Sequence, residues 1–283
     1  MRKIGILSDS TCDLNKLLLE KYDIHTFPLH VHLGNDAYLD GIDITPDEIY
    51  KWSDEHETTP KTSALSLSEA TSYLDDMLKQ YDYLFVFTIS EKMSSCCSVM
   101  FMAANSHEES NRIKIIDSKN LSTGIALQMI HLRKWINEGL EIDDMTNKLF
   151  ELQSKVCSSF VVDSLTYLYR GGRCNGVAAL FGNSFKFHPT IKVEDGEMKV
   201  GKFYRGKINK SLIKYVEDLT PSLQQANQDI VFITHSGCEQ ETLDLVYEQI
   251  KQLNYFKEIF ITRAGSVISS HCGPATLGVL YVK

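Results

Sequence analysis

The stretch from Tyr83 to Ser98, YLFVFTISEKMSSCCS, changes from apolar to polar and back to apolar within a few residues. Leu84–Phe87 is a run of aromatic and aliphatic residues, which is typical of a strand buried on both faces in a parallel sheet. From Met93 onward, apolar residues recur at helical spacing. Ser94 or Ser95 is therefore expected to cap this helix by accepting a hydrogen bond from a backbone N–H of its first turn.

Hydroxyl groups are dense in the loop between this strand and this helix, at Thr88, Ser90, Ser94 and Ser95. A helix N-terminus at the carboxyl end of a strand adds free N–H groups and the positive end of the helix dipole. Such a loop suits an anionic group, either a phosphate or a carboxylate. An ordinary N-cap in a strand-to-helix loop is the alternative, and this stretch alone does not decide between them.

The rest of the chain predicts an α/β fold in two parts. In the first half, strands such as Ile4–Leu7 and Ile113–Ile116 alternate with helices, which predicts a largely parallel sheet with flanking helices. In the second half, the Asp195-Gly196 pair predicts a tight hairpin, and a mixed sheet with flanking helices is expected. We place the boundary near residue 156, which gives an N-terminal domain of 1–156 and a C-terminal domain of 157–283.

Composition narrows the class of protein. The chain has 283 residues with 43% hydrophobic and 23% charged residues, as in ordinary globular proteins. Its net charge of −8 disfavours non-specific binding to nucleic acid or to an anionic membrane surface. The seven cysteines include no C-x-x-C pair, so neither a disulfide framework nor a zinc site is indicated. With no signal peptide and no apolar stretch of membrane-spanning length, we expect a cytoplasmic protein without stable membrane insertion.

Several other constellations have competing interpretations. Ser94 with His271 or His235 could form the nucleophile and base of a hydrolase, but no G-x-S-x-G motif surrounds the serine. His30 and His32 share one face of a strand and could bind a metal with His25 or Asp36, although exposed histidines are the simpler interpretation.

Two further motifs have simpler explanations. Gly171-Gly172-Arg173 lacks the sequence of a P-loop, so it indicates a tight turn rather than a nucleotide site. Cys96-Cys97 at a helix start could have lowered thiol pKa values, but small buried apolar side chains are the more ordinary interpretation.

From end to end, the chain resembles the DegV family of bacterial fatty-acid-binding proteins. The first half carries the matching stretches DST at 9–11, TSALS at 62–66, ISEKMSS at 89–95 and IIDS at 115–118. The second half carries YLYRGGR at 167–173 and HCGPATLGVLY at 271–281. Their order and spacing make the resemblance specific.

The resemblance implies a lipid carrier rather than an enzyme. Such a protein holds one long-chain fatty acid, with its tail buried and its carboxylate near the junction of two α/β domains, and needs no cofactor. The implied partner is a separate, ATP-dependent fatty acid kinase, which converts the presented carboxylate to an acyl phosphate for phospholipid synthesis.

The resemblance also implies the site residues. The expected carboxylate site comprises Thr62, Ser63, Ser94, Ser95 and His271. Arg173 and Arg205 fall where the family has arginines that serve the partner kinase or phosphoryl transfer.

This chain departs from the family pattern beside the expected site. The family has Gln-Pro where this chain has Ala64-Leu65, and Gly-Thr where it has Ser95-Cys96. If the family glycine adopts a positive φ, Ser95 is strained or the loop is reshaped. Two alternatives therefore remain: a hydrolase or transferase that acts on a small anionic substrate through Ser94 and His271, and a family member that has lost lipid binding and acts through protein contacts.

Overall fold

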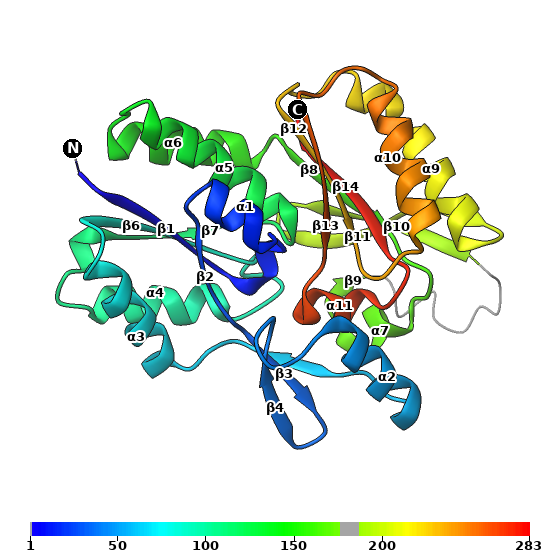
Figure 1. Ribbon diagram of the computed structural model, residues 1–283. Helices are drawn as coiled ribbons and strands as arrows, with labels where there is room; N and C mark the ends of the chain where they lie inside the picture. Colours follow the sequence, from blue (N-terminus) through cyan, green and yellow to red (C-terminus); the bar gives the residue numbers. More distant parts are fainter. Residues whose placement is uncertain (1, 176–186) are drawn as a thin grey trace.

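The computed structural model describes residues 2–175 and 187–283, and its strands form two main sheets that lie side by side (Figure 1). The first sheet has four parallel strands, as predicted for this half. Their order across the sheet is β2 (His25–Phe27), β1 (Ile4–Asp9), β6 (Tyr83–Thr88) and β7 (Ile113–Asp117).

Helices cover both faces of the first sheet (Figure 1). On one face lie α3 (Leu67–Leu78) and α4 (Cys96–Ser106), which pack against each other and against β6. The opposite face carries α5 (Thr123–Asn137), which also contacts α6 (Ile142–Gln153). The short helix α1 (Lys16–Lys21) follows the 3-10 turn η1 (Ser10–Cys12), and the 3-10 turn η2 (Ser110–Arg112) precedes β7.

The second sheet is mixed, which confirms the prediction for the second half. Seven strands occur in it among the described residues. Their order is β13 (Glu258–Arg263), β12 (Ile230–His235), β14 (Leu277–Val282), β8 (Val156–Val161), β10 (Phe187–Glu194), β11 (Glu197–Arg205) and β9 (Cys174–Asn175). The helices α9 (Ile208–Leu223) and α10 (Gln240–Lys251) pack on its outer face.

The helix α5 lies between the two sheets. Almost every residue in its first half is buried, because it contacts β1 and β6 on one side and β8, β12 and β14 on the other. One hydrophobic cluster therefore runs from Ile6 through Leu127 to Leu280. The chain passes from one sheet to the other between β7 and β8, but the division into two domains at residue 156 stays a prediction.

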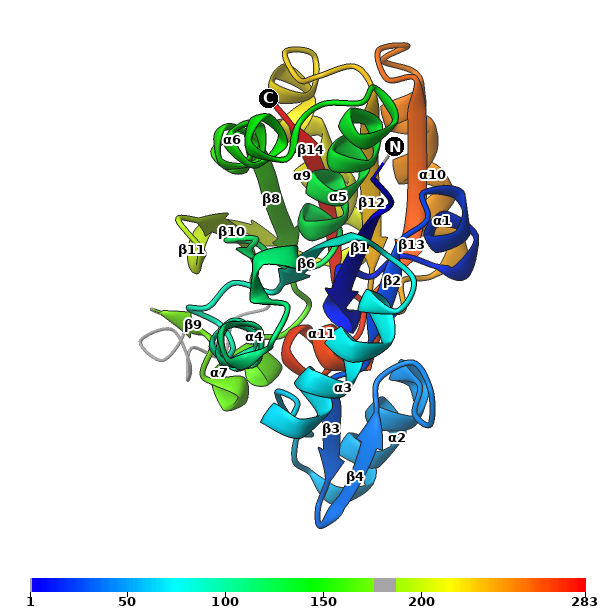
Figure 2. The same ribbon diagram turned by 90° about the vertical axis from the view of Figure 1, so that its left-hand side faces the viewer.

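A small antiparallel sheet projects from one end of the molecule (Figure 2). It consists of β3 (His30–Leu33), β4 (Asp36–Leu39) and β5 (Lys61–Ser63), with α2 (Pro46–His56) between β4 and β5. The polar run TTPKTSALS at 58–66 predicts a connection rather than a strand, and this prediction is wrong for Lys61–Ser63, which form β5. Its residues are polar because the strand is mostly exposed, so no apolar alternation marks it.

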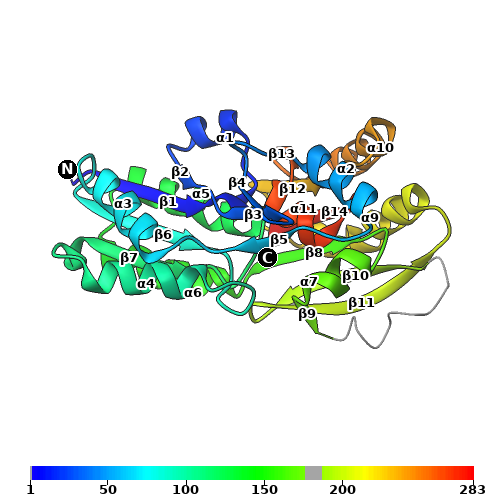
Figure 3. The same ribbon diagram turned by 90° about the horizontal axis from the view of Figure 1, so that it is seen from below.

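Two short helices, α7 (Thr166–Gly171) and α11 (Ser266–Cys272), complete the fold. The stretch HCGP at 271–274 predicts a loop between two strands, and this prediction is wrong for His271 and Cys272, which form the last turn of α11. This helix packs against α2, α7, β3 and β5 (Figure 3). It has only seven residues, several of them serines, so its sequence carries little helical periodicity.

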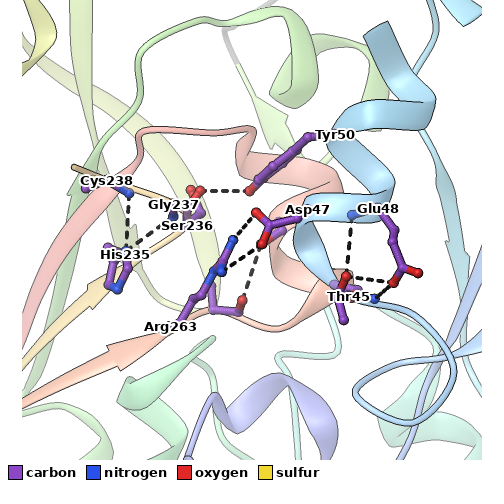
Figure 4. Close-up of polar contacts among 12 residues, drawn as sticks. Thr45, Asp47, Glu48, Tyr50, His235, Ser236, Gly237, Cys238 and Arg263 are labelled. Atoms are coloured by element: carbon purple, nitrogen blue, oxygen red, sulfur yellow. Dashed lines mark hydrogen bonds and ion pairs between the residues drawn. The ribbon is translucent and has the colours of Figure 1, made fainter. Parts of the chain in front are cut away.

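Polar contacts attach α2 to the carboxyl ends of β12 and β13 (Figure 4). Arg263 forms a bidentate ion pair with Asp47, and the Tyr50 hydroxyl donates to the Ser236 carbonyl oxygen at 2.9 Å. Nδ1 of His235 accepts from the N–H groups of Gly237 and Cys238 at 3.2 Å each. The contacts of Arg263 and Tyr50 tie a segment of the first half to the second sheet, whereas those of His235 lie within the second half.

Candidate functional site

A cavity of about 210 Å³ lies where the two halves of the chain meet. One part of its wall is polar and comes from β5, from the loop after β6 and from the end of α11. The other part is apolar. The lining residues are Leu29, Thr62, Ser63, Ala64, Ile89, Met93, Ser94, Ser95, Leu121, Arg173, Met198, Val267, Ile268, His271 and Cys272.

All five residues expected at the carboxylate site line this cavity. They come from three segments that are far apart in the sequence. Thr62 and Ser63 lie on β5, Ser94 and Ser95 precede α4, and His271 lies on α11. The hydroxyls therefore converge on one polar wall, but which of them contact a ligand stays a prediction.

The loop before α4 is held by backbone and side-chain contacts. The buried Asp9, at the end of β1, accepts from the Ile89 N–H through Oδ2 at 2.7 Å. Ser95 occupies the N-cap position, but its side chain makes no capping hydrogen bond. Instead, Ser94 Oγ accepts from the Cys96 N–H at 3.2 Å. The predicted strand, loop and helix are thus confirmed, with Ser94 as the residue whose oxygen accepts the N–H bond.

His271 joins this cluster through Thr62. Its Nε2 lies 2.8 Å from Thr62 Oγ1. Burial, together with the nearby positive charge of Arg173, lowers the pKa of His271 to about 4. The imidazole is therefore neutral at pH 7. A Cβ added at Gly171 would lie only 2.4 Å from His271 Nδ1, so this glycine allows α7 to approach the histidine closely.

Two buried carboxyl groups from the first half hold the start of α11. Asp13 Oδ1 accepts from the Gly265 N–H at 2.8 Å, and Asp40 Oδ1 accepts from the Ser266 N–H at 2.6 Å. Burial, together with the nearby charge of Asp40, raises the pKa of Asp13 to about 8. The helix that carries His271 is therefore positioned by groups that sequence reasoning did not identify as part of the site.

The two arginines predicted for partner or phosphoryl-transfer roles lie in different places. Arg173 lines the cavity, whereas Arg205, at the end of β11, does not line it and packs over the Phe187 ring with its guanidinium carbon 4.6 Å from the centroid. The role predicted for each arginine stays a prediction.

A second cavity of about 360 Å³ adjoins the first and shares Arg173 and His271 with it. Three cationic side chains line it, those of Lys61, Arg170 and Arg173, against one carboxylate, that of Glu57. The polar side of the first cavity therefore borders a second cavity in which cationic side chains outnumber carboxylates.

The apolar end of the site continues beyond the first cavity. A small cavity of about 30 Å³ lies next to it and shares three lining residues with it, Leu121, Ile268 and Cys272. It extends toward β12 and β14, where its lining includes Phe160 and Leu280. These three side chains therefore border both spaces.

The departures from the family pattern do not strain the loop. Ser95 has φ −75°, so no positive φ is required of it. Cys96 does not line the cavity and is fully buried, and its burial, with the nearby Asp9, raises the pKa of its thiol well above the usual range. Burial raises the thiol pKa of Cys97 as well. These two cysteines therefore act as buried side chains rather than reactive thiolates.

The histidines considered for a metal have other partners. His30 Nε2 lies 3.1 Å from Glu69 Oε1, and His32 Nε2 lies 2.9 Å from Ser63 Oγ. Within residues 2–175 and 187–283, no group of three or more histidine, cysteine, aspartate or glutamate side chains could hold a metal ion.

Three groups that shape the site were missed in the sequence. Met198, just after the Asp195-Gly196 turn, lines the cavity. Asp13 and Asp40 hold α11; Asp13 follows the 3-10 turn η1 and Asp40 follows β4, so in the sequence each looks like an ordinary turn residue. What marks them as important is that they are buried, and the sequence does not show this because the burial arises only when the two halves pack together.

Known proteins resemble the chain over its whole length. The family model described as "Uncharacterised protein, DegV family COG1307" matches residues 3–283. A DegV domain-containing protein of Clostridium perfringens is 30% identical over 288 residues, which cover 100% of this chain and 98% of the relative.

Solved structures have the same fold. A DegV family protein of Thermus thermophilus, described as binding fatty acid, matches with a TM-score of 0.90 and 25% identity over 100% of both chains. A protein of Eubacterium ventriosum, described as binding stearic acid, matches with a TM-score of 0.85 and 30% identity over 99% of this chain and 98% of that one. In the described parts of this chain, no helix has both the length and the apolar character needed to cross a bilayer.

Proposed function

The chain belongs to the DegV family, and we propose that it binds one long-chain fatty acid in the cavity between its two halves. The observation that supports this is the division of the cavity wall, in which hydroxyl groups and a neutral imidazole face an apolar space. A carboxylate removed from water needs several hydrogen-bond donors, and hydroxyls can provide them.

Burial of the acyl chain supplies most of the affinity in this proposal. Each buried methylene contributes about 0.8 kcal/mol, so a chain of ~14 methylenes contributes on the order of 11 kcal/mol before ordering costs. The first cavity, at about 210 Å³, is smaller than the roughly 300–1,000 Å³ of typical ligand sites. A long tail therefore requires Leu121, Ile268 and Cys272 to move, so that it can reach the small cavity beyond them.

We further propose that the carboxylate is presented to a fatty acid kinase. Lys61, Arg170 and Arg173 around the adjoining cavity support this, because cationic side chains beside the carboxylate could accept the charge of an added phosphoryl group. Arg205, exposed at the end of β11, is proposed to contact the partner protein.

The rival function is a hydrolase that uses Ser94 and His271. Among the described residues no hydrogen bond joins these two side chains: Ser94 Oγ bonds the Cys96 N–H, and His271 Nε2 bonds Thr62. A nucleophile and its base are expected within hydrogen-bond reach of each other. The geometry therefore favours binding over acyl transfer.

Mass spectrometry of the purified protein, first native and then after denaturation and extraction, tests the proposal. We expect one fatty acid per chain. A protein that contains no lipid and takes up no added fatty acid would contradict the carrier function. Hydrolysis of acyl esters or acyl phosphates that is abolished by His271→Ala would instead establish the rival.

A further inference from the structure

The turn between β10 and β11 touches the loop that carries Ser94 and Ser95. The buried Ser90 hydroxyl donates to the Gly196 carbonyl oxygen at 2.7 Å, across 106 positions of sequence. Beside it, Lys92 Nζ lies 3.5 Å from Glu197 Oε1. That ion pair is partly exposed to solvent and contributes little, so the buried hydrogen bond is the main polar contact here.

Only glycine allows this approach. Gly196 has φ +80°, which L-residues with a side chain rarely adopt. A Cβ at this position would also lie 2.6 Å from Ser90 Oγ, closer than van der Waals contact permits. The Asp-Gly pair therefore does more than close a hairpin, because its glycine lets the turn reach the loop.

On the loop side, the backbone of Ser90 is hydrogen-bonded to that of the site residue Ser94. Its carbonyl oxygen accepts from the N–H groups of Met93 at 2.9 Å and Ser94 at 3.1 Å. Its own N–H donates to the Asn120 carbonyl oxygen at 2.9 Å. A displacement of Ser90 is therefore passed directly to Ser94.

On the hairpin side, the strand β11, which begins directly after Gly196, reaches two other parts of the site. Met198, two residues after Gly196, lines the cavity. It also pairs with Cys174 of β9, the residue after Arg173. The turn thus connects the serine loop, the apolar wall and the segment with Arg173.

We propose that the Ser90–Gly196 contact positions the carboxylate-binding loop, so that both residues govern recognition of the ligand's head group although neither lines the cavity. This inference rests on the proposed fatty acid binding. Ser90 and Gly196 are positioning residues, because they act through Ser94 and Ser95 rather than by touching the ligand.

The test compares two ligands with the same tail, stearic acid and stearyl alcohol. Their affinities are measured by competition with one fluorescent fatty acid. Because both bury the same methylenes, the ratio of the two affinities reports the contacts of the carboxylate. Ser90→Ala and Gly196→Ala should each lower the affinity for the acid about tenfold and change that for the alcohol much less.

Gly201→Ala is the matched control, since Gly201 lies on β11, the strand that follows Gly196, and its Cβ would come no closer than 3.4 Å to any atom. This variant should keep the acid-to-alcohol ratio of the unaltered chain. In the double variant Ser90→Ala, Gly196→Ala, the loss of affinity for the acid should be smaller than the sum of the losses in the two single variants. The reason is that removal of the Ser90 hydroxyl also removes the atom with which the new Cβ would clash. If Gly196→Ala does not fold, Ser90→Ala alone carries the test, since it adds no atom.

The possible results separate this inference from the function on which it rests. An unaltered chain that binds neither ligand overturns the proposed function. An unaltered chain that prefers the acid, with Ser90→Ala keeping that preference, overturns the positioning role and leaves the function standing. An equal loss of affinity for both ligands in the single variants also overturns it, since it indicates a general disturbance of the fold.

Discussion

Thr62 Oγ1 and His271 Nε2 lie 2.8 Å apart, although 209 positions separate these residues in the sequence. The contact joins β5 of the small sheet to α11, which precedes the last strand of the second sheet. It therefore connects the two halves of the chain at the polar wall of the cavity. Four predictions follow from this arrangement and from the charges around it.

Removal of the Ser94 hydroxyl should weaken lipid binding without unfolding the protein. Ser94→Ala loses a hydroxyl at the cavity wall, and a lost hydrogen bond to a carboxylate costs about 1.5–3 kcal/mol. Lipid retention after purification, measured by mass spectrometry, should fall accordingly. Ser98→Ala, an exposed position on α4, is the control and should retain its lipid. Unchanged lipid content in Ser94→Ala would show that this hydroxyl does not hold the ligand.

Thr62→Val should reduce both stability and binding. Valine has a similar shape but leaves His271 Nε2 without its partner, and an unpaired buried polar group costs about 1–3 kcal/mol. Urea unfolding and fatty acid titration measure the two effects. Thr62→Ser keeps the hydroxyl and should behave nearly as the unaltered chain does. If valine and serine variants are equally stable, the hydrogen bond contributes nothing.

His271 should make the protein less stable as the pH falls below neutral. Its pKa in the folded protein is about 4, below the ordinary 6.5, because it is buried and lies near Arg173. The unfolded chain thus binds the proton more readily, so the contribution to stability is complete above pH 6.5 and is lost toward pH 4.

The variant His271→Gln isolates this effect. Between pH 7 and pH 4, its free energy of unfolding should fall less steeply than that of the unaltered chain, by up to about 3 kcal/mol over the interval. Denaturant unfolding at several pH values measures the difference. If the free energy of unfolding has the same pH dependence in both proteins, the pKa of His271 is not lowered by folding.

Asp13 should make the protein less stable as the pH rises, which is the opposite of the effect of His271. Burial raises its pKa to about 8, from an ordinary value near 3.8. The folded protein therefore keeps a proton that the unfolded chain releases, and the stability from this group is lost as the pH rises through about 8.

Asp13→Asn stays uncharged and can still accept from the Gly265 N–H. Relative to the unaltered chain, it should gain stability with rising pH, by up to about 1.4 kcal/mol per unit between pH 5 and pH 8. Thermal unfolding across this range provides the measurement. A constant difference between the two proteins would indicate that Asp13 is already ionised in the folded state.

The sequence by itself determined those features that depend on neighbouring residues. The capping boxes at Thr45 and Ser66 start α2 and α3 as their side chains predict, and Asp195-Gly196 forms the hairpin turn. The buried run before Ser94 is β6. In each case the signal is local, because a side chain bonds the backbone three residues away or an apolar run matches one type of element.

Only the tertiary structure decided which distant groups meet. α11 has too few residues to show a periodic pattern, and β5 is too exposed, yet together they place His271 beside Thr62. Likewise, Gly196 reaches Ser90 because β10 and β11 extend from the second sheet to the loop after β6. Contacts of this kind depend on strand register and on the packing of the two sheets against α5, and neither is encoded in a short stretch of residues.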